Sequence, residues 1–173
     1  SSRRRHTRYG TVTGVQTCAL PISHHKRRKQ VVCLGAGLVS QPLVDYLSRD
    51  SNISLLVISS IPGEAQAIAT NARRSNVSAR TADVLQDLHV LEAVFAASDC
   101  VVSLLPAAMH VPVAEACIRA RTPLVTASYV SEEMQQLHHA AEGAGVAILC
   151  EMGLDPGIDH MSAMQMIDRK STR

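Results

Sequence analysis

The sequence predicts a doubly wound α/β fold built on a parallel sheet, and three observations support this prediction. Short apolar runs rich in β-branched residues recur along the chain. They lack the polar alternation of a half-exposed strand, as expected of parallel strands covered on both faces. The segments between them carry apolar residues at helical spacing. Strand and helix alternate five times, which is typical of a doubly wound sheet.

The expected elements follow from these runs and from the residues that bound them. In the longest helical segment, for example, Ser131 favours a helix start, and Gly143 with Gly145 favours a stop. Strands are expected over 31–34, 53–58, 77–82, 99–105, 123–126 and 146–150, with 77–82 the weakest, and helices over 39–48, 63–73, 85–96, 111–119, 131–143 and 157–167.

Both ends of the chain look foreign to this pattern. The hexapeptides TCALPI at 17–22 and DRKSTR at 168–173 can be encoded by the two strands of one DNA sequence. We therefore expect 1–23 and 168–173 to be non-native translations of a sequencing adapter. Residues 24–29 are then a basic leader or linker, and 30–167 form one α/β domain, of a size that supports its own core.

Charge and apolar content narrow the class of protein. The formal net charge is +2, but seven of the 17 Lys and Arg residues and one of the 15 Asp and Glu residues lie in the two foreign ends. The rest of the chain is acidic, so a nucleic-acid partner is not expected. No apolar run reaches the ~18 residues of a membrane span. Cysteines fall inside the expected elements without metal-ligand spacing, so they are expected to be reduced and buried: Cys33, Cys100, Cys117 and Cys150.

A glycine turn joins the first expected strand to the first expected helix. Gly35 permits the tight turn, and Gly37 lets the backbone approach a pyrophosphate at the positive end of the helix. Ser40 replaces the third glycine of the usual fingerprint and is small enough for close helix–strand packing. At this place in the chain, the turn predicts a Rossmann domain that binds a nicotinamide dinucleotide. The alternative, a flexible turn, leaves the other strand ends unexplained.

The turn after the second strand favours NADP over NAD. An acidic side chain there would bind the ribose 2′-hydroxyl of NAD, but the chain has Ser59, Ser60 and Ile61. Two hydroxyls and free amides accommodate a 2′-phosphate, which a carboxylate repels. NAD remains the alternative, because the turn contains no arginine and serines are also common turn residues.

Three further strings close expected strands, at the edge where ligands bind in open α/β sheets. They are SLLP at 103–106, VTASY at 125–129 and EMGLDPGIDH at 151–160. With residues 35–42, they resemble saccharopine dehydrogenase of the NADP-dependent, glutamate-forming type, whose domain also occurs fused in bifunctional aminoadipate-semialdehyde synthases. The resemblance implies that 30–167 is the NAD(P)-binding half of an oxidoreductase, truncated before its substrate domain and inactive alone.

The resemblance also implies roles for individual residues. Ser60 stands where fungal relatives carry an arginine, which weakens the case for NADP. The phosphate loop would comprise Gly35, Ala36, Gly37, Leu38 and Val39; the adenosine ribose turn, Ser59, Ser60 and Ile61; the adenine neighbours, Asp83 and Val84; and the nicotinamide-ribose neighbour, Leu105. Further cofactor contacts would come from Ala127, Ser128, Tyr129, Leu154, Asp155 and Pro156, and saccharopine contacts from Ser128, Tyr129 and Asp155.

The implied reaction is the NAD(P)-dependent oxidation of saccharopine in lysine metabolism. Hydride passes from the carbon beside the secondary amine to the nicotinamide, and water attacks the imine to give glutamate and 2-aminoadipate 6-semialdehyde. Tyr129 and Asp155 are the candidate catalytic residues, because a hydroxyl and a carboxylate suit this substrate. Two alternatives stay open: a related C–N oxidoreductase such as carboxynorspermidine dehydrogenase, and a dinucleotide-sensing module without turnover.

The histidines are expected to serve structure. His110 is expected at a helix end or on the surface, His160 at a helix start, and His138 with His139 on a solvated helix face. No metal site or membrane partner is expected. A cytoplasmic location, with the mitochondrion as alternative, and a homodimer of the full-length enzyme complete the expectations.

Overall fold

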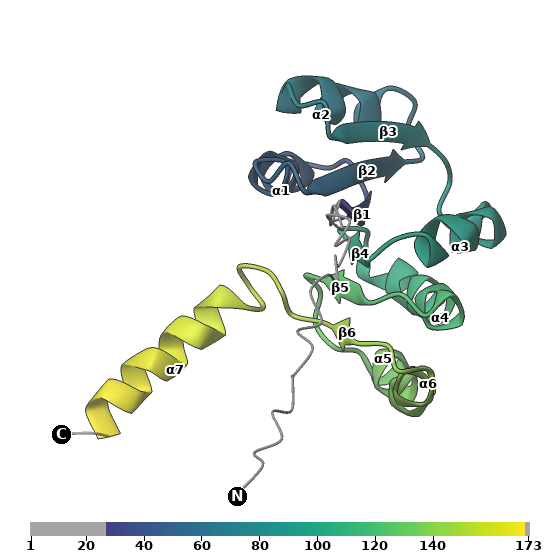
Figure 1. Cartoon of the computed structure of the whole chain (residues 1–173). Helices are drawn as coiled ribbons and strands as arrows, with labels where there is room; N and C mark the ends of the chain where they lie inside the picture. The colour runs from purple at the N-terminus through teal and green to yellow at the C-terminus, as the bar shows by residue number, and fades with distance from the viewer. Residues whose placement is uncertain (1–26, 172–173) are drawn as a thin grey trace, which may run out of the picture.

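The computed structural model describes residues 27–171 and contains one six-stranded sheet with helices on both faces (Figure 1). The expectation for 1–23, half of the leader at 24–29, and the last two residues of 168–173 therefore lie outside the described residues. In chain order the elements are β1 (Lys29–Leu34), α1 (Ser40–Leu47), β2 (Ile53–Ser59), α2 (Glu64–Ala72), β3 (Val77–Thr81), α3 (Leu88–Ala96), β4 (Cys100–Ser103), the 3₁₀ turn η1 (Ala107–Met109), α4 (His110–Ala120), β5 (Leu124–Thr126), α5 (Glu132–Gln136), α6 (His138–Ala144), β6 (Ile148–Leu149) and α7 (Ile158–Ser171).

The sheet is parallel throughout, in the order β3-β2-β1-β4-β5-β6. Strand β1 therefore lies at the centre, where the chain reverses its direction of travel across the sheet. In register, Leu34 lies opposite Ile58 on one side and Ser103 on the other. This order confirms the doubly wound prediction. The switch point beyond the carboxyl ends of β1 and β4 is where sheets of this order form a ligand-binding crevice.

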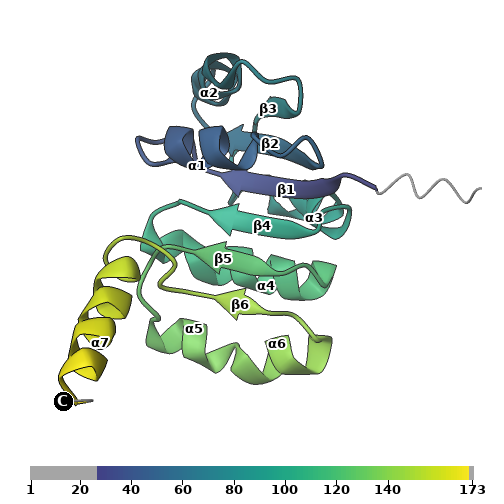
Figure 2. The same cartoon turned by 60° about the vertical axis from the view of Figure 1, so that its left-hand side comes forward.

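Successive residues of β1 serve two separate cores, because side chains of a strand alternate between faces. Val32 and Leu34 pack with Phe95 of α3 and Val113 of α4 on one face. Cys33 packs on the other face, with α1 and α2. Figure 2 shows the two groups of helices on opposite sides of the sheet. Burial on both faces explains why the strands lack polar alternation.

The cysteine expectation holds for two of the four described thiols. Cys33 and Cys117 are free and buried, while Cys100 and Cys150 are free and half-buried. Burial raises the pKa of Cys33 and of Cys117 to about 12. These two thiols are therefore protonated at neutral pH and pack as small apolar side chains.

Element boundaries depart from expectation where side-chain hydrogen bonds intervene. Helix α3 starts at Leu88 instead of residue 85, because the Asp83 carboxylate accepts from the amides of Leu85 and Gln86 in a preceding turn. The helix expected over 131–143 is two helices, broken at Leu137, whose amide bonds to the carbonyl of Met134 three residues back. Strand β6 has two residues instead of five.

Helix α7 stands away from the sheet (Figures 1 and 2). It runs to Ser171, past the boundary expected at 167/168, and Arg169 and Lys170 lie in its last turn, where cations suit a helix end. Its large apolar side chains are exposed: Ile158, Met161, Met164, Met166 and Ile167. Within residues 27–171, none of the helices combines the length and apolar character that a membrane crossing requires.

Candidate functional site

The crevice at the carboxyl edge begins with a close backbone approach between β1 and β4. The amide of Gly35 donates to the carbonyl of Ile58 at 2.8 Å. The amide of Leu104 donates to the carbonyl of Leu34 at 2.9 Å. Gly35 has φ +100°, and a Cβ there would lie 3.2 Å from the Leu104 carbonyl oxygen. Only glycine combines that conformation with that contact at little cost, which confirms the tight turn expected at this position.

Gly37 is open in a way that Gly35 is not. A Cβ built on Gly37 meets nothing within 4 Å, so its backbone faces free space outside the loop. Helix α1 starts three residues later, and no side chain caps its N-terminus. A helix start without a cap leaves amide donors that an anion can satisfy. The geometry fits the approach of a pyrophosphate to this loop.

Ser40 shows why the third glycine of the fingerprint is dispensable here. Its side chain is fully buried, and its hydroxyl donates to the Gly35 carbonyl at 2.9 Å. The hydroxyl thus ties the first turn of α1 to the start of the loop. Leu38 and Val39, by contrast, are 98% and 64% exposed, so this part of the loop is open to a ligand.

The turn after β2 contains a carboxylate that the sequence argument missed. Ser59 is buried, and its hydroxyl donates to Oε2 of Glu64 at 2.9 Å and accepts from the amide of Ile61 at 3.3 Å. Glu64 is the first residue of α2, five positions after Ser59. The end of the strand itself has no acidic residue, whereas the fold brings one in from the next helix. Ser60 and Ile61 are exposed beside this pair.

Asp83 and Val84, the predicted adenine neighbours, both have side chains that already make contacts within the protein. The Asp83 carboxylate accepts from the amides of Leu85 and Gln86, while Val84 is buried in the core. Any contact that these two residues make with a base would therefore come mainly from the backbone. Leu105, the predicted nicotinamide-ribose neighbour, lies against the phosphate loop, 3.6 Å from the position of a Cβ on Gly35.

The loops after β5 and β6 are bonded to one another and carry the predicted catalytic pair. The amide of Glu151 bonds to the carbonyl of Ser128, and that of Met152 to the carbonyl of Thr126, both at 3.0 Å. The Tyr129 hydroxyl donates to Oδ1 of Asp155 at 2.6 Å. The structure therefore brings together Tyr129 and Asp155, which are 26 positions apart. Of the neighbours predicted to contact the cofactor, Leu154 is exposed and Pro156 is buried.

The hydrogen bond to Asp155 raises the pKa of the Tyr129 hydroxyl, followed by smaller effects of desolvation and of the carboxylates Asp155, Asp159 and Glu151. Tyr129 is therefore protonated at neutral pH and acts as a donor. Asp155 provides the acceptor for an amine or a water proton. The pair can orient a polar substrate and take up a proton at the carboxylate.

His110 was expected at a helix end or on the surface, and the second part of that expectation is wrong. It does begin α4, but it is only 3% exposed. Its Nδ1 lies 3.1 Å from the Ser103 hydroxyl, and its Nε2 lies 2.9 Å from the hydroxyls of Thr126 and Ser128. The signal available in the sequence was the set of hydroxyl residues at the ends of the fourth and fifth strands.

Three other histidines lie on α6 and α7. His160 is exposed in the first turn of α7, as expected, with Nδ1 3.1 Å from Oδ1 of Asp159. His138 and His139 are exposed on α6, also as expected, and His139 pairs with Glu142 at 3.8 Å.

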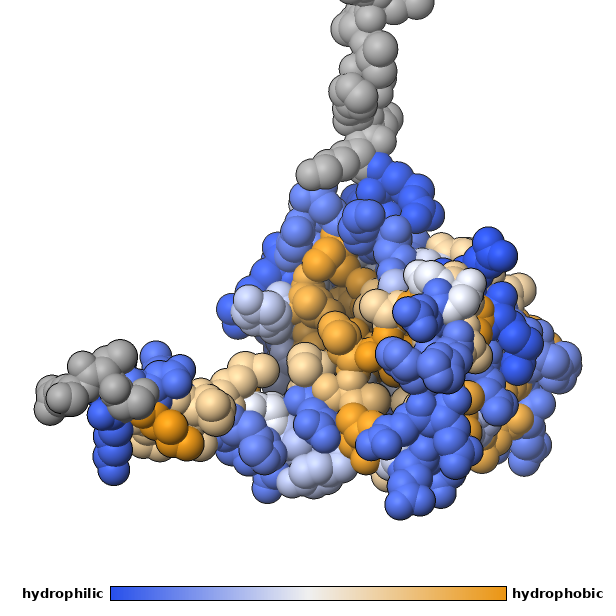
Figure 3. Space-filling view, turned by 90° about the horizontal axis from the view of Figure 1, so that it is seen from below, coloured by the Kyte–Doolittle hydropathy of each residue, from blue (hydrophilic) through white to orange (hydrophobic). Residues whose placement is uncertain are grey.

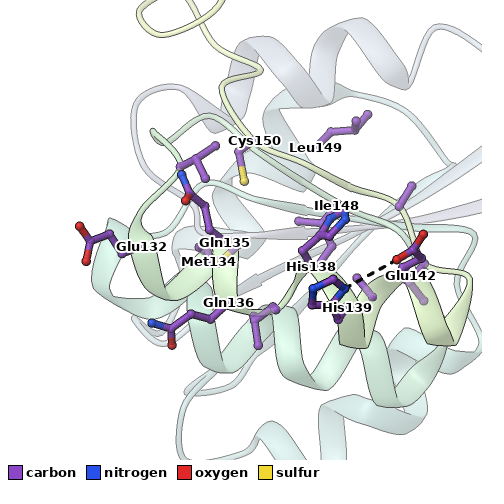
Figure 4. Close-up of a pocket in the computed structure, with 15 residues that line it drawn as sticks. Glu132, Met134, Gln135, Gln136, His138, His139, Glu142, Ile148, Leu149 and Cys150 are labelled. Atoms are coloured by element: carbon purple, nitrogen blue, oxygen red, sulfur yellow. Dashed lines mark ion pairs between the residues drawn. The ribbon is translucent and has the colours of Figure 1, made fainter.

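His138 and His139 border an open cavity of about 980 Å³ between α5, α6 and β6 (Figure 4). The predicted site residues are not part of its lining. Figure 3 shows apolar side chains exposed in a hollow of the face seen from below.

The strand order, the open glycine loop and the polar strand ends define a class of protein, namely a Rossmann domain with its ligand site at the switch point of the sheet. The sequence model described as the saccharopine dehydrogenase NADP binding domain matches residues 31–149. The chain belongs to this family.

Known relatives agree with this assignment. Over 141 residues the chain is 39% identical to the mitochondrial alpha-aminoadipic semialdehyde synthase of Mus musculus, covering 82% of this chain and 15% of the relative. It is 39% identical over 140 residues to the saccharopine dehydrogenase [NADP(+), L-glutamate-forming] of Saccharomyces cerevisiae, covering 81% and 30%. The apo structure of the L-Glu-forming enzyme from that yeast superposes with a TM-score of 0.75 at 38% identity, covering 82% and 31%. The chain thus spans less than a third of each of these relatives.

The buried imidazole predicts a specific pH dependence of stability. Burial lowers the pKa of His110 below its ordinary value of 6.5. As the pH falls below that value, the unfolded chain binds a proton that the folded chain does not, so the free energy of unfolding decreases. We expect the melting temperature to drop more between pH 7.5 and pH 5.5 in the unchanged chain than in a His110→Gln variant. Equal drops in the two proteins would contradict this assignment.

Proposed function

We propose that this chain is the NADP(H)-binding domain of an oxidoreductase of lysine metabolism that oxidises saccharopine to glutamate and 2-aminoadipate 6-semialdehyde. The observation that carries the proposal is the loop after β1. There Gly35 is held against Leu104, Gly37 faces open space and α1 begins without a cap. A helix start of this kind binds phosphate groups, and membership of the family identifies the dinucleotide.

Within this proposal each part of the edge has a task. When bound, the nicotinamide accepts a hydride from the substrate carbon beside the amine. The backbone of 35–39 holds the pyrophosphate, and the turn at Ser59, Ser60 and Ile61 faces the adenosine ribose. Tyr129 donates to Asp155. In the proposed reaction, the Asp155 carboxylate binds the substrate amine and takes the proton released as water adds to the imine. One water is consumed, and one hydride and one proton leave the substrate.

The carboxyl edge of the sheet is rich in carboxylates near Tyr129. These groups can accept hydrogen bonds from a substrate amine, but they cannot pair with substrate carboxylates. Three carboxylates, Glu151, Asp155 and Asp159, act electrostatically on Tyr129. Saccharopine carries several carboxylates, whose charges need basic partners. We propose that these partners belong to the remainder of a longer protein, because the relatives extend well beyond the aligned segment. We propose further that the domain spans 30–167, with non-native ends, that the longer protein is a homodimer, and that it resides in the cytoplasm or the mitochondrion.

The phosphate loop provides a matched pair of glycine variants. Gly37→Ala places a methyl group where the pyrophosphate must approach, so we expect NADPH affinity to fall at least about tenfold, a loss of ~1.4 kcal/mol. Gly143→Ala, on α6, also adds a Cβ that meets nothing within 4 Å, and it should leave affinity unchanged. Both variants should melt no lower than the unchanged chain. Isothermal titration calorimetry measures the affinities, and equal affinity in all three proteins would count against the loop.

Glu64 provides a test of the ribose turn. Its carboxylate is held at the end of β2 by Ser59, and a negative charge there opposes a 2′-phosphate. Glu64→Gln keeps the hydrogen bond from Ser59 and removes the charge. We expect it to strengthen NADPH binding relative to NADH binding by about threefold to tenfold at low salt, with less effect at high salt. An unchanged ratio would place the 2′-phosphate elsewhere.

Turnover tests the reaction itself. The full-length protein that contains this domain should reduce NADP in the presence of saccharopine, and Asp155→Asn should lower kcat at least about a hundredfold if the carboxylate takes the proton. Activity with carboxynorspermidine alone would favour the related C–N oxidoreductase. Dinucleotide binding without turnover of either substrate would favour a sensing module.

A further inference from the structure

Three hydroxyl groups surround the imidazole of His110. Ser103 ends β4, Thr126 ends β5, and Ser128 lies in the loop that follows β5. Ser103 and Thr126 are buried with His110, whereas Ser128 is only half-buried. Ser128 is therefore the member of the set that a ligand can reach.

The distances make the imidazole a shared partner. Nε2 lies 2.9 Å from both the Thr126 and the Ser128 hydroxyl, and Nδ1 lies 3.1 Å from the Ser103 hydroxyl. A neutral imidazole has one N–H donor and one acceptor nitrogen. Two hydroxyls thus approach one nitrogen, and only one of them can make the better bond to its lone pair.

Thr126 indicates which nitrogen is the acceptor. Its oxygen accepts from the Ser128 amide at 3.3 Å, and its hydroxyl proton needs an acceptor because the side chain is 1% exposed. Among residues 27–171, Nε2 is the acceptor that the structure provides for it. We therefore assign the lone pair to Nε2, which two hydroxyls approach, and the N–H to Nδ1, which the Ser103 hydroxyl approaches.

With this proton arrangement, the Ser128 hydroxyl can turn from Nε2 to a ligand without leaving Nε2 unpaired. When Ser128 donates to Nε2, its oxygen lone pairs face the crevice and accept from a ligand N–H. When it turns its proton toward a ligand oxygen, Thr126 still donates to Nε2. Nε2 is then not left without a partner, which matters because an unsatisfied buried acceptor is destabilising.

We propose that His110 is a positioning residue at the carboxyl edge of the sheet. With its proton on Nδ1, it shares Nε2 between Thr126 and Ser128. It thereby holds the Ser128 hydroxyl ready to accept a hydrogen bond from the bound ligand, or to donate one to it. The proposal deepens the proposed function and rests on it, because the ligand of Ser128 is the cofactor or the substrate of that site.

Two substitutions of His110 separate positioning from simple core filling. The amide of glutamine reaches as far along the side chain as Nε2, so His110→Gln keeps a partner for Thr126 and Ser128. The amide of asparagine reaches only as far as Nδ1, so His110→Asn keeps the Ser103 bond and loses the other two. Both variants replace a buried ring by a smaller amide, and similar falls in melting temperature are expected of the two.

The binding of NADPH to the chain, measured by calorimetry, should then differ between the two variants. We expect His110→Gln to bind within about twofold of the unchanged chain, and His110→Asn to bind about fivefold to tenfold more weakly, as for the loss of one hydrogen bond. The ¹⁵N spectrum of the unchanged chain should show His110 protonated at Nδ1 and bare at Nε2, a readout that needs no variant to fold.

Two kinds of result would contradict these proposals, and they can be told apart. Normal NADPH affinity in His110→Asn, or a proton on Nε2 in the unchanged chain, would overturn the positioning role while leaving the proposed function intact. Failure of the unchanged chain to bind NADPH would overturn the proposed function, and the positioning role with it.

Discussion

The contact between Gly35 and the Leu104 carbonyl is the constraint on which the rest of the site depends. Strand β1 has neighbours on both sides, and the chain leaves β1 and β4 toward opposite faces of the sheet. For the loop to take its observed course, the first residue after β1 must pass close to the residue after β4. With φ +100° and 3.2 Å between a hypothetical Cβ and that carbonyl, Gly35 meets this condition, and the loop then delivers Gly37 and the start of α1 to open space.

The polar groups of the edge depend on the same geometry but belong to distant parts of the chain. The end of β5, the loops after β5 and β6, and the start of α4 contribute. They are joined by hydrogen bonds rather than by sequence proximity: Tyr129 to Asp155, Glu151 to Ser128, and His110 to both Thr126 and Ser128. Hydroxyls and carboxylates dominate. Such an edge suits an amine-containing substrate and a neutral buried imidazole, whose lowered pKa follows from burial.

The sequence predicted what local patterns determine. Continuous apolar runs and helix periodicity predicted the doubly wound fold, and glycine spacing predicted the tight turn at Gly35. The family resemblance supplied the candidate pair Tyr129 and Asp155, which the structure brings together. The sequence missed features that arise when distant segments meet. Glu64 reaches Ser59 only because α2 folds back to the end of β2, and the burial of His110 depends on hydroxyls 16 and 18 positions away. No periodicity encodes such contacts.

The most direct test of the central claim is to locate the bound dinucleotide on this chain. Titration of the ¹⁵N-labelled protein with NADPH, followed through backbone amide shifts, should perturb residues 35–39 first, together with Ala127 and Ser128. Shifts confined to the groove between α5, α6 and β6, with the loop after β1 unaffected, would contradict the account.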